Sequence, residues 1–439
     1  MMSGIFAPGD EVRTVSSGVR CEVQTLLGAG GQGEVYRVSV EGSAMALKWY
    51  YPHTATEGQR SALRVLIDSG APDGRFLWPA ELVTAPSKQG FGYLMALREP
   101  RYKGVTDLLV RRVTPSFASL ATAGVHLADG FLGLHARGLC YRDISHGNVF
   151  FDPASGEVLI CDNDNVAPDR TTGGILGTPR FMAPEVVRGK AKPSTQTDLY
   201  SLAVLLFLIL VNHHPLEGQK EASIHCFDLP AMTRLYGSEP VFIFDPVDSS
   251  NRPVPGFHDN ALAFWPLYPV FLKNLFTRSF TVGIKDPDHG RVRETEWRTA
   301  MGRLRDAIFY CGCGAENFYD GDTLKAGGGR PGSCWHCGRT LQLPPRMRIG
   351  KSVVMLNHDA KLYAHHLDDG RAFDFRVPLA EVTRHPSDPN RWGLKNLTGD
   401  RWTVTGADGA VRDVEPGRNL LLAVGTKVRF GKTEGEINL

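Results

Sequence analysis

The stretch YRDISHGN, residues 141–148, decides the fold that this sequence predicts. It places Asp143 five residues before Asn148, and Asp162 follows directly after the apolar run VLIC at 158–161. An Asp that accepts a proton, together with an Asn and a second Asp that hold a divalent cation, is a residue set suited to phosphoryl transfer. The stretch therefore predicts a catalytic loop followed by a metal-binding carboxylate.

A glycine-rich segment lies upstream of this loop. The stretch LLGAGGQGEVYRV at 26–38 contains Gly28, Gly30 and Gly33, and the run AMALK ends at Lys48. Apolar and polar residues alternate after Gly33, which indicates strands, whereas a helix follows the glycines of a dinucleotide-binding fold. Because glycine has no Cβ, its backbone can approach phosphates closely. The pattern predicts a strand–loop–strand cover over a nucleotide, with Lys48 supplying a positive charge to its phosphates.

A third segment, GTPRFMAPE at 177–185, lies downstream, and Asp198 precedes the apolar run 199–210. A run that is apolar on every face indicates a buried helix, and this one is too short to span a bilayer. With these motifs in this order, roughly residues 18–307 resemble a bacterial Hanks-type (eukaryotic-like) Ser/Thr protein kinase. The resemblance implies an α+β, bilobal protein-kinase fold over 1–308, with a small lobe at about 18–98 and a large lobe at 99–308.

The resemblance also implies which residues do the chemistry. Asp143 is expected to accept the proton of a protein hydroxyl, while Asn148 and Asp162 hold Mg²⁺ or Mn²⁺ on ATP and Lys48 contacts the phosphates. Positioning and charge neutralisation then carry the reaction. The expected ATP-binding residues are Leu27, Gly28, Gly30, Gly33, Val35, Ala46, Lys48, Met95, Ala96, Leu97 and Phe150.

Other motif residues are expected to organise the loops. In the resembled family an Arg at the position of Arg142 commonly docks a phosphate on the activation segment. Thr171 and Thr172 are therefore candidate phosphosites, since a phosphate there could order the segment; two solvated loop threonines are the equal alternative. The resemblance assigns structural roles to Arg142, Thr178, Glu185 and Asp198, of which Asp198 is expected to brace the catalytic loop.

Several positions depart from the family pattern. Ser145 stands where these kinases usually carry a Lys, and Asn163-Asp164 replaces Phe-Gly after the metal-binding Asp. Asp164 would either face the metal or cap a turn, and the cap is favoured. No Glu stands clearly where the partner of Lys48 is expected, so Glu57 or Gln59 would have to serve. These departures leave open a nucleotide-binding pseudokinase scaffold, whereas GTPRFMAPE argues against a small-molecule kinase.

Four of the eight cysteines cluster between 311 and 337. Cys311-x-Cys313-Gly and Cys334-x-x-Cys337-Gly form two knuckles, and paired thiolates on tight turns suit a tetrahedral structural zinc. The sequence therefore predicts a zinc ribbon at 309–344. The alternatives are four free thiols or, with less support because no βα pattern surrounds the knuckles, a redox pair.

Residues 345–439 change to strand-like alternation, which predicts an all-β sandwich. The stretches WGLKNLTGDRWTV at 392–404 and GTKVRFG at 425–431 resemble a forkhead-associated (FHA) domain. Gly399-Asp400-Arg401 replaces that family's phosphate-binding residues, so we expect a domain that docks a protein without needing phosphate. His365 and His366 are expected on opposite faces of a strand, where they could not share a metal.

Composition limits the remaining classes of partner. The net charge of +2 and the absence of a long basic run give no electrostatic support for nucleic-acid binding. The first 14 residues lack a basic and an apolar region, so we expect no signal peptide, no membrane insertion and a cytoplasmic protein. The resemblance extends to kinases encoded beside a PP2C-type phosphatase and a von Willebrand A protein in tellurite-resistance-type systems. Both proteins are therefore candidate partners, besides the protein substrate.

Overall fold

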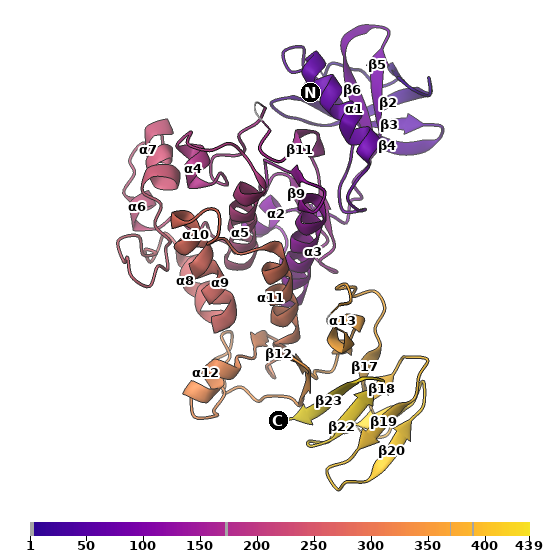
Figure 1. The fold of residues 1–439 in the computed structure, drawn as a ribbon, viewed down its shortest axis with the longest axis vertical. Helices are drawn as coiled ribbons and strands as arrows, with labels where there is room; N and C mark the ends of the chain where they lie inside the picture. Colours follow the sequence, from indigo (N-terminus) through magenta and orange to yellow (C-terminus); the bar gives the residue numbers. More distant parts are fainter. Residues whose placement is uncertain (1–3, 172–173, 369, 389) are drawn as a thin grey trace. The chain divides into compact units, whose positions relative to one another are not determined.

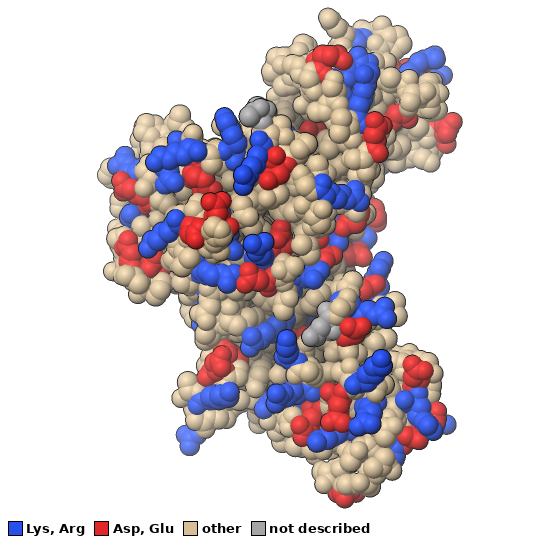
Figure 2. Space-filling view, viewed as in Figure 1, with Lys and Arg blue, Asp and Glu red and all other residues tan. Residues whose placement is uncertain are grey.

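The computed structural model describes residues 4–171, 174–368, 370–388 and 390–439. The chain divides into two compact units. Unit 1 comprises Met1–Pro115, His126–Asp259 and Thr277–Thr295, and unit 2 comprises Ser116–Val125, Asn260–Phe276 and Glu296–Leu439. Lys and Arg are interspersed with Asp and Glu on the face shown in Figure 2, in keeping with the small net charge.

A closed barrel forms the N-terminal part of unit 1, with helix α1 beside it (Figure 1). Residues of the inner face alternate with exposed ones along β1 and β2, as expected for strands with one buried face. Phe6 packs edge-on against Tyr36 and Trp49, with ring centroids 5.6 and 4.9 Å apart. The strand order is β1-β2-β3-β4-β6-β5, and the elements are β1 (Glu11–Thr14), β2 (Arg20–Ala29), β3 (Gly33–Val40), β4 (Ser43–Tyr50), α1 (Glu57–Ser69), β5 (Glu81–Ala85) and β6 (Lys88–Ala96).

The predicted strand–loop–strand cover is confirmed, because β2 and β3 pair antiparallel and the glycine loop joins them. The N–H of Gly30 donates to the carbonyl of Gly33 at 2.9 Å and closes the turn. The barrel also contains a strand that the sequence did not indicate: β1 lies before residue 18 and closes the barrel by pairing with both β2 and β5.

The rest of unit 1 is mainly helical. Helix α5 is buried at every position from Thr197 to Val211, which confirms the predicted buried helix. Its first turn is capped by Ser194, whose hydroxyl accepts the N–H of Thr197 at 3.3 Å. The elements between residues 103 and 285 are β7 (Lys103–Gly104), α2 (Val105–Leu109), α3 (Phe117–His135), β8 (Leu139–Cys140), β9 (Val149–Phe151), β10 (Val158–Ile160), η1 (Asn163–Asn165), β11 (Ala167–Pro168), α4 (Pro184–Val187), α5 (Thr195–Val211), α6 (Gln219–Ala222), α7 (Leu229–Thr233), η2 (Arg234–Ser238), α8 (Asp259–Phe264), η3 (Trp265–Leu267), α9 (Val270–Phe280) and α10 (Val282–Lys285). Of these, the part of α3 up to Val125 and the stretch Asn260–Phe276, with η3 and most of α8 and α9, belong to unit 2.

Helix α3 is long and apolar enough, by length and composition alone, to cross a membrane. About two thirds of its apolar stretch (67%) is buried inside the protein. A buried core helix passes the same test of length and composition, so α3 is weak evidence for a membrane span.

Most of unit 2 follows α11 (Glu294–Asp306), whose residues Trp297, Met301 and Leu304 are buried at helical spacing. A short hairpin, β12 (Ile308–Tyr310) with β13 (Glu316–Phe318), leads into two antiparallel sheets that share one apolar core. The predicted strand-rich C-terminal region is thus confirmed as a fold class. The sheets have the orders β15-β14-β23-β22-β19-β20 and β16-β17-β18-β21, and the elements are α12 (Gly321–Ala326), β14 (Arg346–Ile349), β15 (Ser352–Met355), β16 (Lys361–Leu362), α13 (Ala364–Leu367), β17 (Ala380–Arg384), β18 (Trp392–Asn396), β19 (Trp402–Thr405), β20 (Val411–Val414), β21 (Asn419–Leu421), β22 (Lys427–Phe430) and β23 (Thr433–Asn438).

The expectation for His365 and His366 is wrong. Both residues lie on the short helix α13 and not on a strand. The N–H of Tyr363 donates to Nδ1 of His366 at 2.9 Å, and this local bond turns the chain out of the extended conformation. The two rings consequently lie on the same side of the chain, with centroids 4.1 Å apart.

Candidate functional site

The side chain of Lys48 lies buried at the centre of a cluster of polar groups in unit 1. Its Nζ lies 2.9 and 3.0 Å from the two carboxylate oxygens of Asp164, whose side chain is fully buried, and 3.6 Å from Oδ1 of Asp162. Burial alone would lower the pKa of Lys48, but the two carboxylates raise it above its ordinary value. Lys48 is therefore held as a fully charged ammonium group.

The role expected for Asp164 requires correction, since its side chain caps no turn and pairs with Lys48. It also accepts a hydrogen bond from the hydroxyl of Tyr50. Glu57, at the start of α1, is exposed. Gln59 comes closer, with Nε2 donating to the Tyr50 hydroxyl at 3.2 Å and to the Asp164 carbonyl at 3.3 Å. The acidic partner of the lysine thus comes from the segment after Asp162 and not from α1.

Asn163 stands where the resembled family has a Phe, and its side chain is completely buried. Its Nδ2 donates to the carbonyls of Leu77 and Ile160 at 3.0 and 2.9 Å. These bonds fix the segment after Asp162 to the end of β10 and to the backbone at Leu77. Asp162 itself adopts a left-handed conformation with φ of 51°, which is costly for a residue with a Cβ and tends to occur at functional sites.

Asp143 and Asn148 form a second group of contacts. The amide nitrogen of Asn148 donates to Oδ2 of Asp143 at 3.0 Å, which leaves the amide oxygen as a potential ligand. Thr178 donates to Oδ1 of Asp143 through its N–H at 2.8 Å and its hydroxyl at 2.7 Å. The pKa of Asp143 is raised by burial, which these hydrogen bonds only partly offset. The carboxylate is thus fixed from two sides and is more basic than an exposed Asp.

Asp198, near the N-terminus of α5, accepts hydrogen bonds from the backbone of the loop that contains Asp143. Its two oxygens accept the N–H groups of Tyr141 at 2.6 Å and Arg142 at 3.0 Å, and its Oδ2 also bonds Nε2 of His135 at 3.1 Å. The other nitrogen of His135 bonds Glu294. Burial alone would lower the pKa of His135, but the two carboxylates raise it to about 9. A protonated imidazole between two acids therefore supports the loop.

Three further contacts fix the loop and the segment that follows it. Glu185 forms a buried ion pair with Arg291, with Oε1 2.6 Å from the guanidinium. Nε of Arg142 donates to the carbonyl of Asn165 at 2.6 Å. The hydroxyl of Thr171 donates to the carbonyl of Pro168 at 2.6 Å. The other candidate phosphosite, Thr172, lies outside the described residues.

Several of the expected ATP-binding residues gather in one apolar cluster of unit 1. Ala46 and Met95 are buried in it, and Val35, Leu97 and Phe150 line it as partly buried residues. Leu27 and Ala96 are more exposed and are not part of this cluster. Residues of β3, β4, β6 and β9 thus form one apolar cluster, and apolar side chains of this kind suit contact with a flat aromatic ring.

The three glycines of the loop have different surroundings. A Cβ added at Gly28 or Gly30 would meet no atom within 4 Å, so open space adjoins both positions. A Cβ at Gly33 would lie 2.0 Å from the carbonyl oxygen of Trp49, so this glycine is needed for the close pairing of β3 and β4. Gln32, which sequence reasoning missed, joins the loop to the cluster: it accepts from Lys48 at 3.0 Å and donates to Asn165 at 3.1 Å.

The structure brings the four clustered cysteines of unit 2 together. Sγ of Cys311 lies 3.7 Å from that of Cys337, and Sγ of Cys313 lies 3.8 Å from that of Cys334. Four sulfurs each about 2.3 Å from one zinc ion would lie ~3.8 Å apart, whereas a disulfide requires about 2.05 Å. Burial would raise the pKa of Cys334, but the N–H groups of Cys337 and His336 lower it to about 6. The geometry fits one tetrahedral ion.

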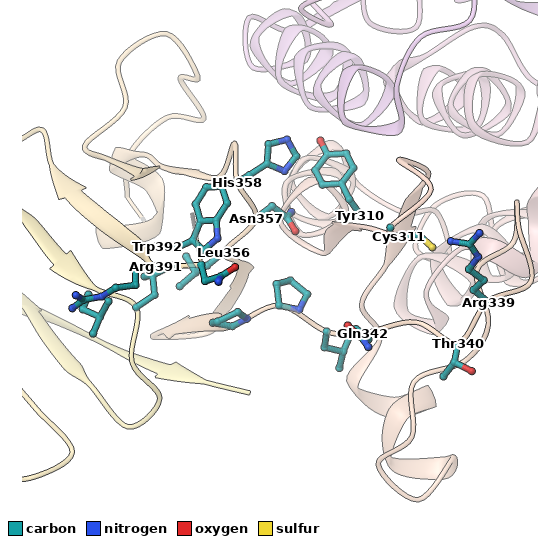
Figure 3. Close-up of a pocket in the computed structure, with 17 residues that line it drawn as sticks. Tyr310, Cys311, Arg339, Thr340, Gln342, Leu356, Asn357, His358, Arg391 and Trp392 are labelled. Atoms are coloured by element: carbon teal, nitrogen blue, oxygen red, sulfur yellow. The ribbon is translucent and has the colours of Figure 1, made fainter. Parts of the chain in front are cut away.

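A cavity of about 790 Å³ lies in unit 2 between the cysteine-bearing segment and the β-sheets (Figure 3). Tyr310, Asn357 and His358 line one part of it, and Arg391 and Trp392 line another. Aromatic, amide and cationic side chains in one concave surface are common in peptide-binding sites.

Comparison with known proteins identifies the type of domain. Residues 93–261 match the family described as protein kinase domain. Serine/threonine-protein kinase PkaB of Streptomyces coelicolor is 34% identical over 120 residues, which cover 25% of this chain and 28% of that protein. Serine/threonine-protein kinase pkn2 of Myxococcus xanthus is 27% identical over 224 residues, covering 45% of this chain and 25% of that protein. CBL-interacting protein kinase 4 of rice is 32% identical over 122 residues, 26% of each chain.

The matched segments span only about a quarter of the length of these three relatives. Residues 93–261 are therefore similar to a protein kinase domain, and the proteins that this chain resembles include bacterial serine/threonine kinases. These matches agree with the predicted protein-kinase fold for residues 93–261.

The protonated His135 leads to a prediction about stability and pH. The pKa is about 9 in the folded chain and 6.5 ordinarily, so the stabilisation is complete below pH 6.5 and is lost as pH rises through 9. We expect the free energy of unfolding to fall over that window by up to about 3 kcal/mol. Urea denaturation between pH 6 and 10, monitored by tryptophan fluorescence, measures it.

The matched control is His135→Gln, whose side chain keeps a hydrogen bond but does not titrate. The variant should be less stable than the parent at pH 6 and should lose most of the decline toward pH 10. An equal decline in both proteins would contradict the assignment of the titration to His135.

Proposed function

We propose that this chain is an ATP- and Mg²⁺-dependent serine/threonine protein kinase that transfers the γ-phosphoryl group to protein hydroxyls, including its own. The observation that carries the proposal is the convergence of Lys48, Asp143, Asn148 and Asp162 within one unit, together with a fully buried acidic partner for the lysine. In this proposal the kinase domain spans 1–308, with its lobes at about 18–98 and 99–308.

The residues present fit a nucleotide with a divalent cation. The open space beside Gly28 and Gly30 leaves room for phosphates, and the apolar cluster around Met95 offers apolar side chains for contact with adenine. Asn148 and Asp162 would hold Mg²⁺ or Mn²⁺, both of which prefer oxygen ligands. The pKa of Asp162 is raised by burial, with Lys48 opposing and the nearby carboxylates of Asp164 and Asp143 adding to the rise. A divalent cation relieves that repulsion, which is the charge it supplies to the site.

Asp143 is proposed as the residue that orients the substrate hydroxyl and accepts its proton. Thr178 and Asn148 fix the carboxylate, and burial keeps it more basic than an exposed Asp. Lys48 would neutralise charge on the phosphates, and Arg142 remains a candidate dock for a phosphate on Thr171 or Thr172. Glu185 and Asp198 are proposed as supports of the loops through their contacts with Arg291 and with the Tyr141 and Arg142 N–H groups.

The pseudokinase alternative loses one of its three supports. It drew on Ser145, on Asn163 and on the lack of a partner for Lys48 from α1. Asp164 supplies that partner, whereas Ser145 and Asn163 still depart from the family pattern. The names of the relatives likewise favour an active kinase over a scaffold.

For the C-terminal part we propose a zinc ribbon at 309–344 and an FHA-like sandwich at 345–439 that docks a protein. The sulfur–sulfur distances support the zinc, and the two packed antiparallel sheets support the sandwich. The cavity beside Tyr310 and Trp392 is a suitable docking surface (Figure 3). A PP2C-type phosphatase and a von Willebrand A protein remain candidate partners by resemblance, and a cytoplasmic location remains a proposal.

We predict that Asp143→Asn abolishes phosphate incorporation from labelled ATP and Mg²⁺ while ATP affinity stays within about threefold, because the residue acts on the hydroxyl and not on the nucleotide. Incubation followed by phosphosite mapping measures the first, and titration calorimetry the second. Asp68→Asn, at an exposed position on α1, is the control and should behave like the parent. A parent protein that binds ATP but incorporates no phosphate would establish the pseudokinase alternative instead.

A second prediction concerns the partner of the lysine. Asp164→Asn keeps the shape of the side chain but leaves the buried ammonium short of one negative charge, a loss of about 3 kcal/mol or more for such pairs. We expect kcat/KM to fall at least about 100-fold. Glu57→Gln is the matched control on α1 and should be close to the parent. The reverse pattern, with Glu57→Gln the more damaging, would mean that α1 supplies the partner during turnover.

We further predict that Cys313→Ser removes one zinc ion per chain relative to the parent and destabilises unit 2, because a structural zinc contributes folding energy of order 10 kcal/mol in small domains. Elemental analysis measures the metal, and thermal unfolding measures the stability. Cys226→Ser, an exposed cysteine far along the chain from the cluster, is the control. Equal metal content in all three proteins would refute the ribbon.

A further inference from the structure

A second group of metal-binding side chains lies in unit 2, apart from the cysteines. Asp306 ends α11, and His365 and His366 lie on α13. Each residue offers one ligand atom, and the three atoms lie within 4.8 Å of one another. All three residues are at least nine-tenths buried, with 9%, 7% and 3% of their surfaces exposed. Two imidazoles and one carboxylate are a ligand set that zinc commonly takes in proteins.

The surroundings of the His365 ring are unusual for a buried polar side chain. Neither of its ring nitrogens has a hydrogen-bond partner within the described part of the chain, although both are buried. A buried polar atom without a partner costs about 1–3 kcal/mol, so two on one ring is an unusual arrangement. The ring is held firmly, since it stacks on Phe373 at 4.3 Å and 25°. Gly302 of α11 makes room for this stack, because a Cβ there would lie 2.4 Å from the Phe373 ring.

The environment of His366 fixes which of its nitrogens faces the cluster. Its Nδ1 accepts the N–H of Tyr363, so Nε2 is the atom directed at Asp306, 3.1 and 3.2 Å from the two carboxylate oxygens. These distances suit a hydrogen bond. They also approach the ~3.4 Å that separates two ligands of a tetrahedral zinc ion with bonds of about 2.0–2.1 Å. A hydrogen bond explains His366 and Asp306 but leaves both nitrogens of His365 without a partner, whereas an ion at the cluster would also bind one of these two nitrogens.

We propose that Asp306, His365 and His366 bind a second zinc ion, which fastens the end of α11 to α13. His366 releases the proton on Nε2 as the ion binds, and Asp306 supplies a negative charge. A solvent molecule would complete four-coordination. The proposal does not depend on kinase activity.

The charges around the cluster are compatible with this ion. Arg305 is the opposing charge nearby. Its guanidinium lies over the rings of Tyr363 and Phe375, with its carbon 5.2 and 4.2 Å from their centroids, and its Nε donates to the Thr122 hydroxyl.

The test is a count of zinc in the purified full-length chain and its variants. We expect two zinc ions per parent chain. His365→Phe keeps the stack on Phe373 and removes one ligand, so it should hold one zinc ion. Asp306→Asn, whose amide oxygen can still accept from His366, should also hold one. His385→Phe changes an exposed histidine outside the cluster and should hold two.

Cobalt substitution distinguishes the two sites without relying on a variant that folds. The cysteine cluster should give a thiolate-to-cobalt charge-transfer band, and the second site should add tetrahedral ligand-field bands without one. His365→Phe should lose only the added bands, and Cys313→Ser should lose the charge-transfer band. One zinc ion in the parent, or two in both His365→Phe and Asp306→Asn, would overturn the proposal. If His365→Phe fails to fold, the cobalt spectrum of the parent and the count for Asp306→Asn decide.

Discussion

The buried ammonium group of Lys48 is the constraint on which unit 1 depends. A charge removed from water must be compensated by groups placed close to it, and here Asp164, Asp162 and Gln32 all turn toward one nitrogen. That requirement fixes the glycine loop, the segment after Asp162 and the end of β4 with respect to one another. Helix α1 contributes only the amide of Gln59 at the edge of this group.

Spacing in the sequence was sufficient to find the residues that stand in motifs. Asp143, Asn148 and Thr178 could be named in advance, and the structure gathers them through hydrogen bonds. The partner of Lys48 could not be found that way, since the contact with Asp164 joins residues 116 apart and the family pattern has no acid at that position. Asp164 becomes the partner because the fold buries its carboxylate next to the Lys48 ammonium group, and no local sequence pattern contains that information.

The C-terminal part shows a different limit of sequence reasoning. The four cysteines were predictable because each knuckle is local and carries its own glycine turn. The run KLYAHHL alternates like a strand, yet the chain stops pairing at Leu362 and turns into α13. One bond from the Tyr363 N–H to His366 competes with strand pairing there, and the period of two consequently gave the wrong faces. The closeness of Asp306 to these histidines follows from tertiary packing alone.

Asn163 has a consequence for pharmacology. An apolar side chain at this point would make no hydrogen bonds, so it could swing outward and leave space for a bound compound. In this chain the side chain there is fully buried and bonded to the Leu77 and Ile160 carbonyls, so moving it would take a donor from the Leu77 carbonyl, while the Ile160 carbonyl would keep the N–H of Leu77. Compounds that need such space should find no room here, while compounds that contact only the apolar cluster around Met95 should bind without this barrier.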